Sequence, residues 1–419
     1  MKLLLLCPHF EPDLHAATGE VMTKLVLGLA ERDHQITVVT SLPWYRGHEV
    51  APDWRGRPWR TEKTEWGRIV RAWPFPTTKT DIGARALGFA GQTGLAAGLA
   101  LTTGTHDVVM GMSPPIFLGD AAWLLAKRCR APFVFNTQDI FPDIAVDLGV
   151  LTNPKVIALA RRYERSLYRR ADAITVLSTD QHRNVTGKLP PESGDRVRII
   201  RNFVDLDRIR PVEGIQRTEN PYRRRYGLEG KTVVMYSGNV GLSQSFDLIR
   251  EAARHWADND SVQFVVNGEG AAHDHVAVWA AELDNVTMIP FGPRKDVPQI
   301  LGAADLHLVL LKKGLAASST PSKLYGILAA GRPVLASIDE GSEVCVTVRE
   351  ADCGLSVPPD DAPAFLAALD KLLADGDELA AMGRRGRRHA ETCLTPDAQA
   401  RAYEELFLEL VDGRRSTSR

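Results

Sequence analysis

Short apolar runs alternate along this chain with longer segments whose apolar residues recur every three or four positions. Residues 3–7 and 35–40 are apolar enough for buried strands, and residues 20–32 between them place their apolar side chains on one face of a helix. This alternation continues almost to the end of the chain, which favours parallel sheets covered by helices. The other predicted strands are 107–112, 132–136, 173–178, 196–200, 232–237, 262–266, 286–289, 306–311, 334–336 and 354–357.

One segment interrupts the alternation. Residues 208–230 hold few apolar residues and five Pro or Gly residues, as is typical of a link between domains. A chain of 419 residues is long enough for two domains. We therefore expect an α/β fold with two Rossmann-like doubly wound parallel-sheet domains. They span 1–212 and 213–392, and the amphipathic helix in 393–419 is a candidate to cross back to the first domain.

Composition excludes several classes of protein. Hydrophobic content of 44% and charged content of 25% are ordinary for a globular protein, and the net charge of −1 provides no global field for nucleic acid. The five cysteines form no CxxC and no Cys/His metal spacing, which favours reduced thiols in a cytoplasmic protein. The apolar start is too short for a signal peptide, and the uncharged residues 86–105 favour a packed helix over a membrane span.

Residues 319–336 (STPSKLYGILAAGRPVLA) predict a loop, a short helix, a glycine turn and a buried strand. Pro321 and Ser322 suit the start of the helix, and Gly331 suits its end. Lys323 then places one ammonium at the positive end of the helix, which is a site for a phosphate-bearing ligand. The alternative is a solvated lysine on an ordinary connection.

Polar or glycine-rich segments follow several other predicted strands, where ligands bind in open α/β sheets. Gly19 is either a site of close phosphate approach or a plain helix-entry glycine. Gly268, Glu269 and Gly270 resemble part of a dinucleotide motif, but His273 occupies the third glycine position, which argues against a nicotinamide-dependent oxidoreductase. The remaining residues of this kind are Gly238, Asn239 and Asp139.

The metal signals are weak. Three DxD triplets begin at Asp205, Asp258 and Asp375, but matches of three residues are expected by chance and all three lie in predicted loops. His273 and His275 are expected at the surface. We expect no metal and no cofactor.

Residues 44–76 hold five of the eight tryptophans, with seven basic and four acidic residues. Interleaved Trp and Arg suit either a lipid headgroup layer or a groove for an anionic acceptor. The alternative is a structured excursion whose tryptophans pack inward. This Trp44–Trp73 region is our candidate for peripheral contact with the inner face of the plasma membrane.

Taken together, these segments resemble the family 4 glycosyltransferases of GT-B fold, with the bacterial colanic-acid and O-antigen polysaccharide enzymes most similar. The resemblance covers nearly the whole chain. It rests on HAATG, LAERDHQITVVT, TQDIFPD, NFVDLDRIRP, YSGNVGLSQS, NGEG, FGPRKDVPQILGAADLHLVLL and PSKLYGILAAGRPVLAS.

The resemblance implies a retaining hexosyl- or N-acetylhexosaminyltransferase that acts in cell-surface polysaccharide biosynthesis. The donor would be a UDP- or GDP-sugar, and the acceptor a glycan or lipid, expected to be linked to polyprenyl diphosphate. Family members generally need no metal. The residues that match the family's donor site are Gly19, Gly238, Asn239, Gly268, Glu269, Arg294, Ser322, Lys323, Leu324, Tyr325 and Glu343.

The chain departs from the family at two glutamates, which are Ser318 and Gly326 here. Glu343 is a candidate to replace the ribose contact. The basic residue that many members place near 243–245 is also absent, so Lys323 would carry more of the diphosphate charge, helped by Arg294 or Lys313.

Transfer requires stabilisation of charge on the β-phosphate of the leaving group, which we assign to Lys323. Asp139 is the candidate for orienting or deprotonating the acceptor hydroxyl, with Asp143 second. Helix capping or a loop hydrogen bond is the alternative for both. Two other functions stay open: a nucleotide-sugar epimerase of the same fold, and a non-catalytic nucleotide-sugar-binding partner.

Overall fold

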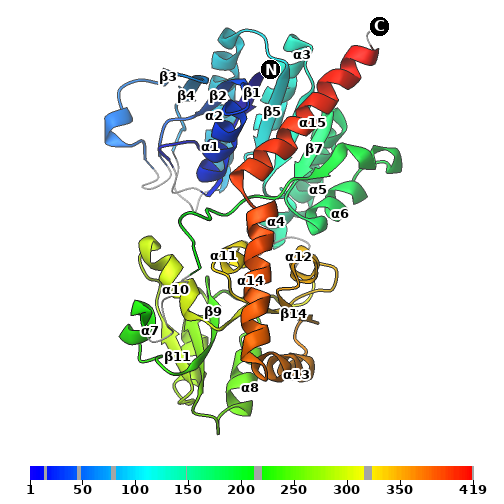
Figure 1. Cartoon of the computed structure of the whole chain (residues 1–419). Coiled ribbons are helices and arrows are strands. Elements are labelled where there is room, and N and C mark those ends of the chain that lie inside the picture. Colours follow the sequence, from blue (N-terminus) through cyan, green and yellow to red (C-terminus); the bar gives the residue numbers. More distant parts are fainter. Residues whose placement is uncertain are drawn as a thin grey trace. The chain divides into compact units, whose positions relative to one another are not determined.

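The structure of the protein is a computed structural model, shown as a ribbon in Figure 1. It describes residues 1–13, 17–44, 49–76, 82–147, 149–211, 219–315 and 323–417.

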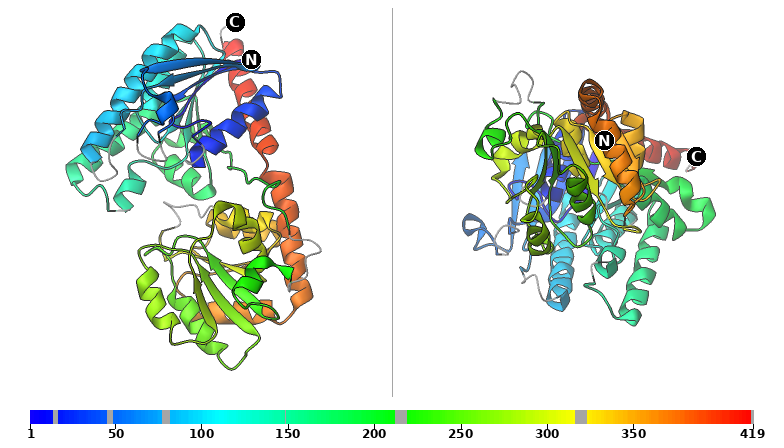
Figure 2. Two further views of the ribbon diagram at one scale, coloured as in Figure 1. Left: turned by 90° about the vertical axis from the view of Figure 1, so that its left-hand side faces the viewer. Right: turned by 90° about the horizontal axis from the view of Figure 1, so that it is seen from below.

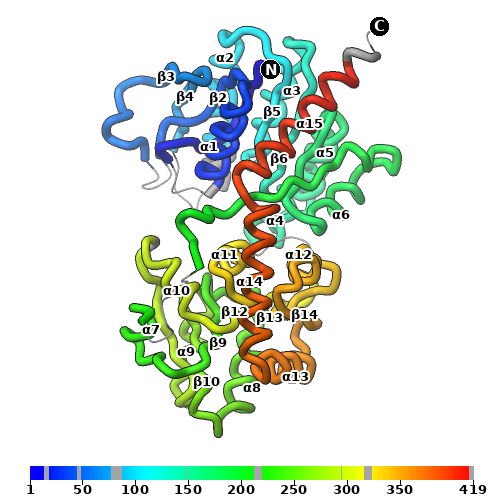
Figure 3. Tube along the Cα trace, in the orientation of Figure 1, coloured from blue at the N-terminus to red at the C-terminus, as the bar shows by residue number. Residues whose placement is uncertain are grey.

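The chain forms two compact units, each built on its own sheet. Unit 1 comprises Met1–Asn202 and Pro396–Arg419, and unit 2 comprises Phe203–Thr395. Figure 3 traces the chain as it leaves unit 1 after Asn202 and returns to it at Pro396. The sequence placed the link between domains at residues 212 and 213, ten residues beyond the first of these crossings.

The sheet of unit 1 has the order β3-β4-β2-β1-β5-β6-β7-β8. All neighbours are parallel except β3 and β4, which pair antiparallel at one edge. The sequence had not predicted this hairpin, because its strands are polar and rich in Arg. The strands are β1 (Lys2–Leu6), β2 (Gln35–Ser41), β3 (Trp59–Thr64), β4 (Gly67–Ala72), β5 (Val108–Ser113), β6 (Phe133–Thr137), β7 (Ala173–Val176) and β8 (Val197–Ile199).

Helices lie on both sides of this sheet (Figure 2), and two separate apolar clusters fill the space beneath them. Leu4 and Leu6 of β1 join one cluster while Leu3 and Leu5 join the other, as the two-residue period of a strand requires. The helices are α1 (Ala17–Ala30), α2 (Ile82–Ala100), α3 (Leu118–Cys129), α4 (Asp143–Asp147), α5 (Pro154–Arg170), α6 (Thr179–Gly187) and α15 (Pro396–Thr417), with 3₁₀ turns η1 (Pro52–Trp54), η2 (Leu101–Thr103) and η3 (Pro191–Arg196).

The C-terminal helix α15 packs on unit 1, as its amphipathic pattern indicated. Gly28 of α1 lets α15 approach closely, since a Cβ there would lie 2.8 Å from the Cβ of Ala400. Tyr403 is buried, and its hydroxyl accepts a hydrogen bond of 2.6 Å from Asn136 Nδ2 at the end of β6. The prediction that the chain crosses back to the first domain is therefore confirmed.

The sheet of unit 2 is entirely parallel and has the order β11-β10-β9-β12-β13-β14. Numbered within the unit this is 3-2-1-4-5-6, the strand order of a Rossmann fold. The strands are β9 (Thr232–Ser237), β10 (Val262–Asn267), β11 (Val286–Ile289), β12 (Leu306–Leu310), β13 (Val334–Ser337) and β14 (Gly354–Val357).

Helices again cover both faces of the sheet in unit 2 (Figure 2). They are α7 (Pro221–Arg225), α8 (Asp247–His255), α9 (His273–Ala280), α10 (Val297–Ala303), α11 (Lys323–Ala329), α12 (Glu343–Ala351), α13 (Ala362–Leu373) and α14 (Gly376–Cys393), with the 3₁₀ turn η5 (Arg294–Asp296). In the described part of the chain, no helix combines the length and the apolar character needed to cross a bilayer. The uncharged stretch that begins at residue 86 lies in α2, which has small residues along much of its length.

Candidate functional site

The strand order of unit 2 reverses between β9 and β12. Crossover helices leave these two neighbouring strands toward opposite faces, so a crevice opens at their carboxyl ends, where ligands bind in open α/β sheets. The loop after β9 contains Gly238 and Asn239, and the connection after β12 leads to α11 and Lys323. Fold topology thus brings together residues that are more than 80 positions apart.

Lys323 is the first residue of α11, and its ammonium lies against an aromatic ring. Its Nζ is 3.7 Å from the ring centroid of Tyr236, the penultimate residue of β9. The Nζ atom is buried and has no hydrogen-bond acceptor among the described residues. Burial lowers the pKa of Lys323 to about 7. A desolvated ammonium lacks the hydrogen-bond partners that water provides. An anion that binds here would therefore stabilise the charged form of Lys323.

Glycines bring the loop after β9 next to this ammonium and pack the loop after β10 against the loop after β9. Gly238 has φ of 142°, and a Cβ there would lie 3.1 Å from Lys323 Nζ. A Cβ on Gly268 would lie 1.9 Å from the carbonyl oxygen of Gly238. The Gly238 amide also donates to the carbonyl of Asn267 at 2.9 Å. A side chain at Gly268 would therefore separate loops that pack backbone to backbone, and one at Gly238 would press on the side chain of Lys323.

Asn239 and Glu269 have exposed side chains on these loops. The carbonyl of Asn239 accepts a 2.6 Å hydrogen bond from the hydroxyl of Tyr236, and the carbonyl of Glu269 accepts one of 2.8 Å from the amide of Val240. Backbone bonds hold both loops, so both side chains are available to a ligand.

The other predicted residues of unit 2 lie deeper or outside the described part. Leu324 and Tyr325 bury their side chains in the core, which leaves only their backbone for a ligand. Glu343 begins α12, is 1% exposed and accepts a 3.4 Å hydrogen bond from Thr347. Arg294 is described for its backbone alone, and Ser322 lies outside the described residues. Their roles in donor binding stay predictions.

In unit 1, Gly19 lies in the first turn of α1 and is buried. A Cβ there would be 2.5 Å from the carbonyl oxygen of Asp13 and 3.4 Å from the Cβ of His9. Close packing of the helix on the loop after β1 is therefore reason enough for glycine at this position, and the contact with donor phosphates stays a prediction.

The two aspartates proposed for acid–base chemistry differ in their surroundings. Asp139 follows β6, is exposed at the strand tip, and has its pKa raised by partial desolvation. Asp143 accepts hydrogen bonds from Lys188 at 2.7 Å and from Asn184 at 3.2 Å. Burial alone would raise the pKa of Asp143, but these bonds hold it below its ordinary value. Asp143 thus belongs to a structural network, and Asp139 is the better candidate for the reaction.

Sequence reasoning missed one pair in unit 1. His9 and Asp13 follow β1 next to the point where the strand order of this sheet reverses, and both are buried. His9 Nδ1 is 3.3 Å from Asp13 Oδ2, and the same oxygen accepts a hydrogen bond of 3.2 Å from the amide of Trp44. The HxxxD spacing directly after a strand is the signal by which this pair was recognisable.

The Trp-rich segment forms the edge hairpin β3–β4. Two guanidinium groups contact the Trp54 ring, with the Cζ atoms of Arg60 and Arg71 at 4.8 and 4.9 Å from its centroid. Trp66 packs toward the core against Phe10, whereas Trp59 is 51% exposed. Trp54 and Trp66 thus fit the interpretation as a structured excursion, whereas Trp59 lies at the surface.

The chain matches two protein-family models that together span both units. Residues 17–202 match the glycosyl transferase 4-like domain, and residues 219–389 match the glycosyl transferases group 1. WcaI of Escherichia coli K12, named as a colanic acid biosynthesis glycosyl transferase, is 26% identical over 385 residues, covering 89% of this chain and 92% of that protein.

Two solved structures share the fold over nearly the whole chain. Sucrose-phosphate synthase from Thermosynechococcus elongatus has a TM-score of 0.70 at 17% identity, covering 99% of this chain and 100% of that one. Anabaena HepE in complex with UDP-glucose has a TM-score of 0.63 at 14% identity, covering 98% and 100%. The two family models, on two Rossmann-like units, show that the chain belongs to the family 4 glycosyltransferases of GT-B fold.

Proposed function

We propose that this glycosyltransferase takes its sugar from a nucleoside diphosphate sugar carrying UDP or GDP. The observation that supports this best is the Lys323 ammonium, which is buried beside the glycine loops at the switch point of unit 2 and has no acceptor among the residues that the structure describes. A diphosphate offers the charge and the oxygen atoms that this group lacks. HepE, which shares the fold, is known in complex with UDP-glucose.

Lys323 would act on the leaving group. As the bond between the sugar and the diphosphate breaks, negative charge grows on the β-phosphate, and a cation already in place stabilises it without reorganisation. With a pKa of about 7 in the free protein, the amine is partly neutral near neutral pH. The bound diphosphate favours the charged form, so donor binding takes up a proton.

The proposed acceptor is a glycan or a lipid, linked to polyprenyl diphosphate, in the biosynthesis of a cell-surface polysaccharide. The name of WcaI, which refers to colanic acid, supports this assignment. Trp59, together with the exposed Arg55 and Arg57 that precede it, would contact the membrane at its inner face, where such an acceptor lies. A hexosyl or N-acetylhexosaminyl group would be transferred with retention of configuration, without metal or cofactor.

Asp139 would orient or deprotonate the acceptor hydroxyl. Its raised pKa and its exposure at the β6 tip suit a group that exchanges a proton with a substrate. In unit 2, Gly326 lies within α11 where the family has a carboxylate, and Glu343 is the proposed substitute for the ribose contact.

A thermal-shift screen of UDP-, GDP- and TDP-sugars tests the donor proposal, followed by a transfer assay with the best binder. We expect a shift with one nucleotide class, and its loss together with loss of transfer in Lys323→Met. Lys371→Met, which removes an exposed lysine of α13, is the matched control. Near-normal transfer by a folded Lys323→Met protein would refute the phosphate assignment.

A further inference from the structure

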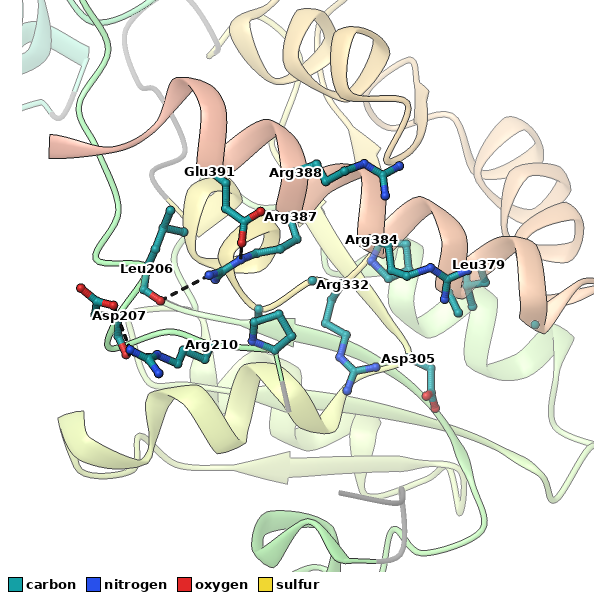
Figure 4. Close-up of a pocket in the computed structure, with 16 residues that line it drawn as sticks. Leu206, Asp207, Arg210, Asp305, Arg332, Leu379, Arg384, Arg387, Arg388 and Glu391 are labelled. Carbon is teal, nitrogen blue, oxygen red and sulfur yellow. Dashed lines mark hydrogen bonds and ion pairs between the residues drawn. The ribbon is translucent and has the colours of Figure 1, made fainter. Parts of the chain in front are cut away.

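Unit 2 contains a cavity of about 700 Å³ that the proposed reaction does not use. It lies among the residues that precede β12 and β13, at the amino ends of these strands. Lys323 and the glycine loops lie at the opposite, carboxyl edge of the same sheet. Figure 4 shows the cavity between one side of α14 and the loops that contain Asp207 and Arg332.

Guanidinium groups dominate the charge of this cavity. Five arginines and three carboxylates line it, and each carboxylate is already paired. Asp207 binds Arg210 at 2.9 Å, Glu391 binds Arg387 at 2.7 Å, and Asp305 binds the buried Arg223 at 2.7 Å.

Arg384 and Arg388 have no such partner. Among the described residues, no carboxylate lies within ion-pair distance of either group. They are exposed one turn apart on α14, where like charges repel and weaken a helix. Two uncompensated cations thus face the same cavity from one helix.

Close packing and hydrogen bonds join the segments that line the cavity. Gly383 of α14 packs on the turn after α11 so closely that a Cβ would lie 2.2 Å from the carbonyl oxygen of Gly331. The guanidinium of Arg387 donates to the carbonyl of Ile209 at 2.7 Å and to that of Ala329 at 2.6 Å. One arginine therefore joins α14, the segment before residue 211 and the end of α11, which gives a preformed concave site.

We propose that this cavity binds a small phosphate-bearing molecule, with Arg384 and Arg388 holding the phosphate oxygens. The planar guanidinium group donates paired hydrogen bonds that match phosphate geometry. The volume lies within the range of about 300–1,000 Å³ for small-molecule sites and exceeds what a single phosphate ion fills. A sugar phosphate or a nucleotide has the right size and charge, and it would bind here without displacing the donor.

Calorimetric titration with inorganic pyrophosphate tests the site, using Arg384→Gln/Arg388→Gln against the wild-type chain. Glutamine keeps the helix propensity of arginine and removes its charge, and both positions are exposed, so the variant is expected to fold. The control, Arg162→Gln/Arg165→Gln, removes two exposed charges from α5 in unit 1.

We expect a saturable binding event whose dissociation constant rises at least about tenfold in Arg384→Gln/Arg388→Gln, the effect of losing charge-assisted hydrogen bonds. The control and Lys323→Met should retain it, and this retention separates the cavity from the donor site. Absent pyrophosphate binding, or equal binding in Arg384→Gln/Arg388→Gln, would overturn the proposal. So would Arg384- and Arg388-dependent binding to phosphatidylglycerol vesicles without binding of free pyrophosphate, since that result assigns the arginines to a membrane surface.

Discussion

The buried ammonium of Lys323 predicts a pH-dependent stability that a single substitution removes. The pKa of this group is about 7 in the folded protein and 10.5 for a free lysine side chain. Since the folded-state pKa is the lower one, the unfolded chain binds more protons between these two values, and stability rises with pH across that window. Lys323→Met keeps an unbranched chain beside Tyr236 and abolishes this contribution.

The size of this pH-dependent stability follows from the difference between the folded and unfolded pKa values of Lys323. Each pH unit well above the folded-state pKa adds about 1.4 kcal/mol to the stability of the wild-type protein, and because the amine is already half deprotonated at pH 7, the step from pH 7 to pH 9 contributes about 2 kcal/mol. More than about one pH unit below the folded-state pKa, both states are protonated and the contribution is constant. We therefore expect the stability difference between wild type and Lys323→Met to shift by about 2 kcal/mol toward the wild type between pH 7 and pH 9.

Urea denaturation of wild type, Lys323→Met and Lys371→Met at both pH values measures this shift. All other titrating groups are shared, so they cancel in the difference between two proteins. Lys371 is exposed on α13, and its variant should follow the wild type at both pH values. A difference between wild type and Lys323→Met that is the same at pH 7 and pH 9 would show that Nζ is solvated, and the argument for an anion site there would fall.

Three further expectations concern residues on both sheets. Gly238→Ala adds a Cβ at φ of 142°, 3.1 Å from Lys323 Nζ, so transfer should fall at least about tenfold in a steady-state assay while circular dichroism stays unchanged. Asp139→Asn should lower kcat and flatten the acidic limb of the pH profile of kcat. In the wild type, the pKa that sets this limb lies above the ordinary aspartate value of 3.8, because desolvation raises the pKa of Asp139. An unchanged pH profile in the variant would exclude Asp139 as the base. Tyr403→Phe removes a hydroxyl that is bonded to Asn136 at 2.6 Å inside unit 1, and denaturation should show a loss of about 1–3 kcal/mol; no loss would mean that α15 is not held there.

The sequence determined most of the architecture because most elements carry their own periodic signal. Buried parallel strands are apolar throughout, and amphipathic helices repeat every three to four residues, so both can be recognised without knowing their partners. The helix that begins at Pro396 was predicted to leave the second domain and cross back to the first. The place of Lys323 at the start of a helix was also visible, since a helix start followed by Gly331 and Pro333 is a local pattern.

Only the tertiary structure decided which residues meet. Lys323 and Tyr236 are 87 positions apart, and their contact exists because β9 and β12 are neighbours in the sheet. Helix α14 was not predicted, because Gly376, Gly383 and Gly386 interrupt its sequence. Gly383 is there because the helix axis must approach the carbonyl of Gly331.

The arginine-lined cavity of unit 2 also exists only because of the tertiary structure. Arg332 precedes a strand, Arg210 lies near the start of unit 2, and Arg384 and Arg388 belong to its last helix. The sequence shows that each of these residues is charged. The fold decides that these arginines line one cavity, because it packs together segments that are far apart in the sequence.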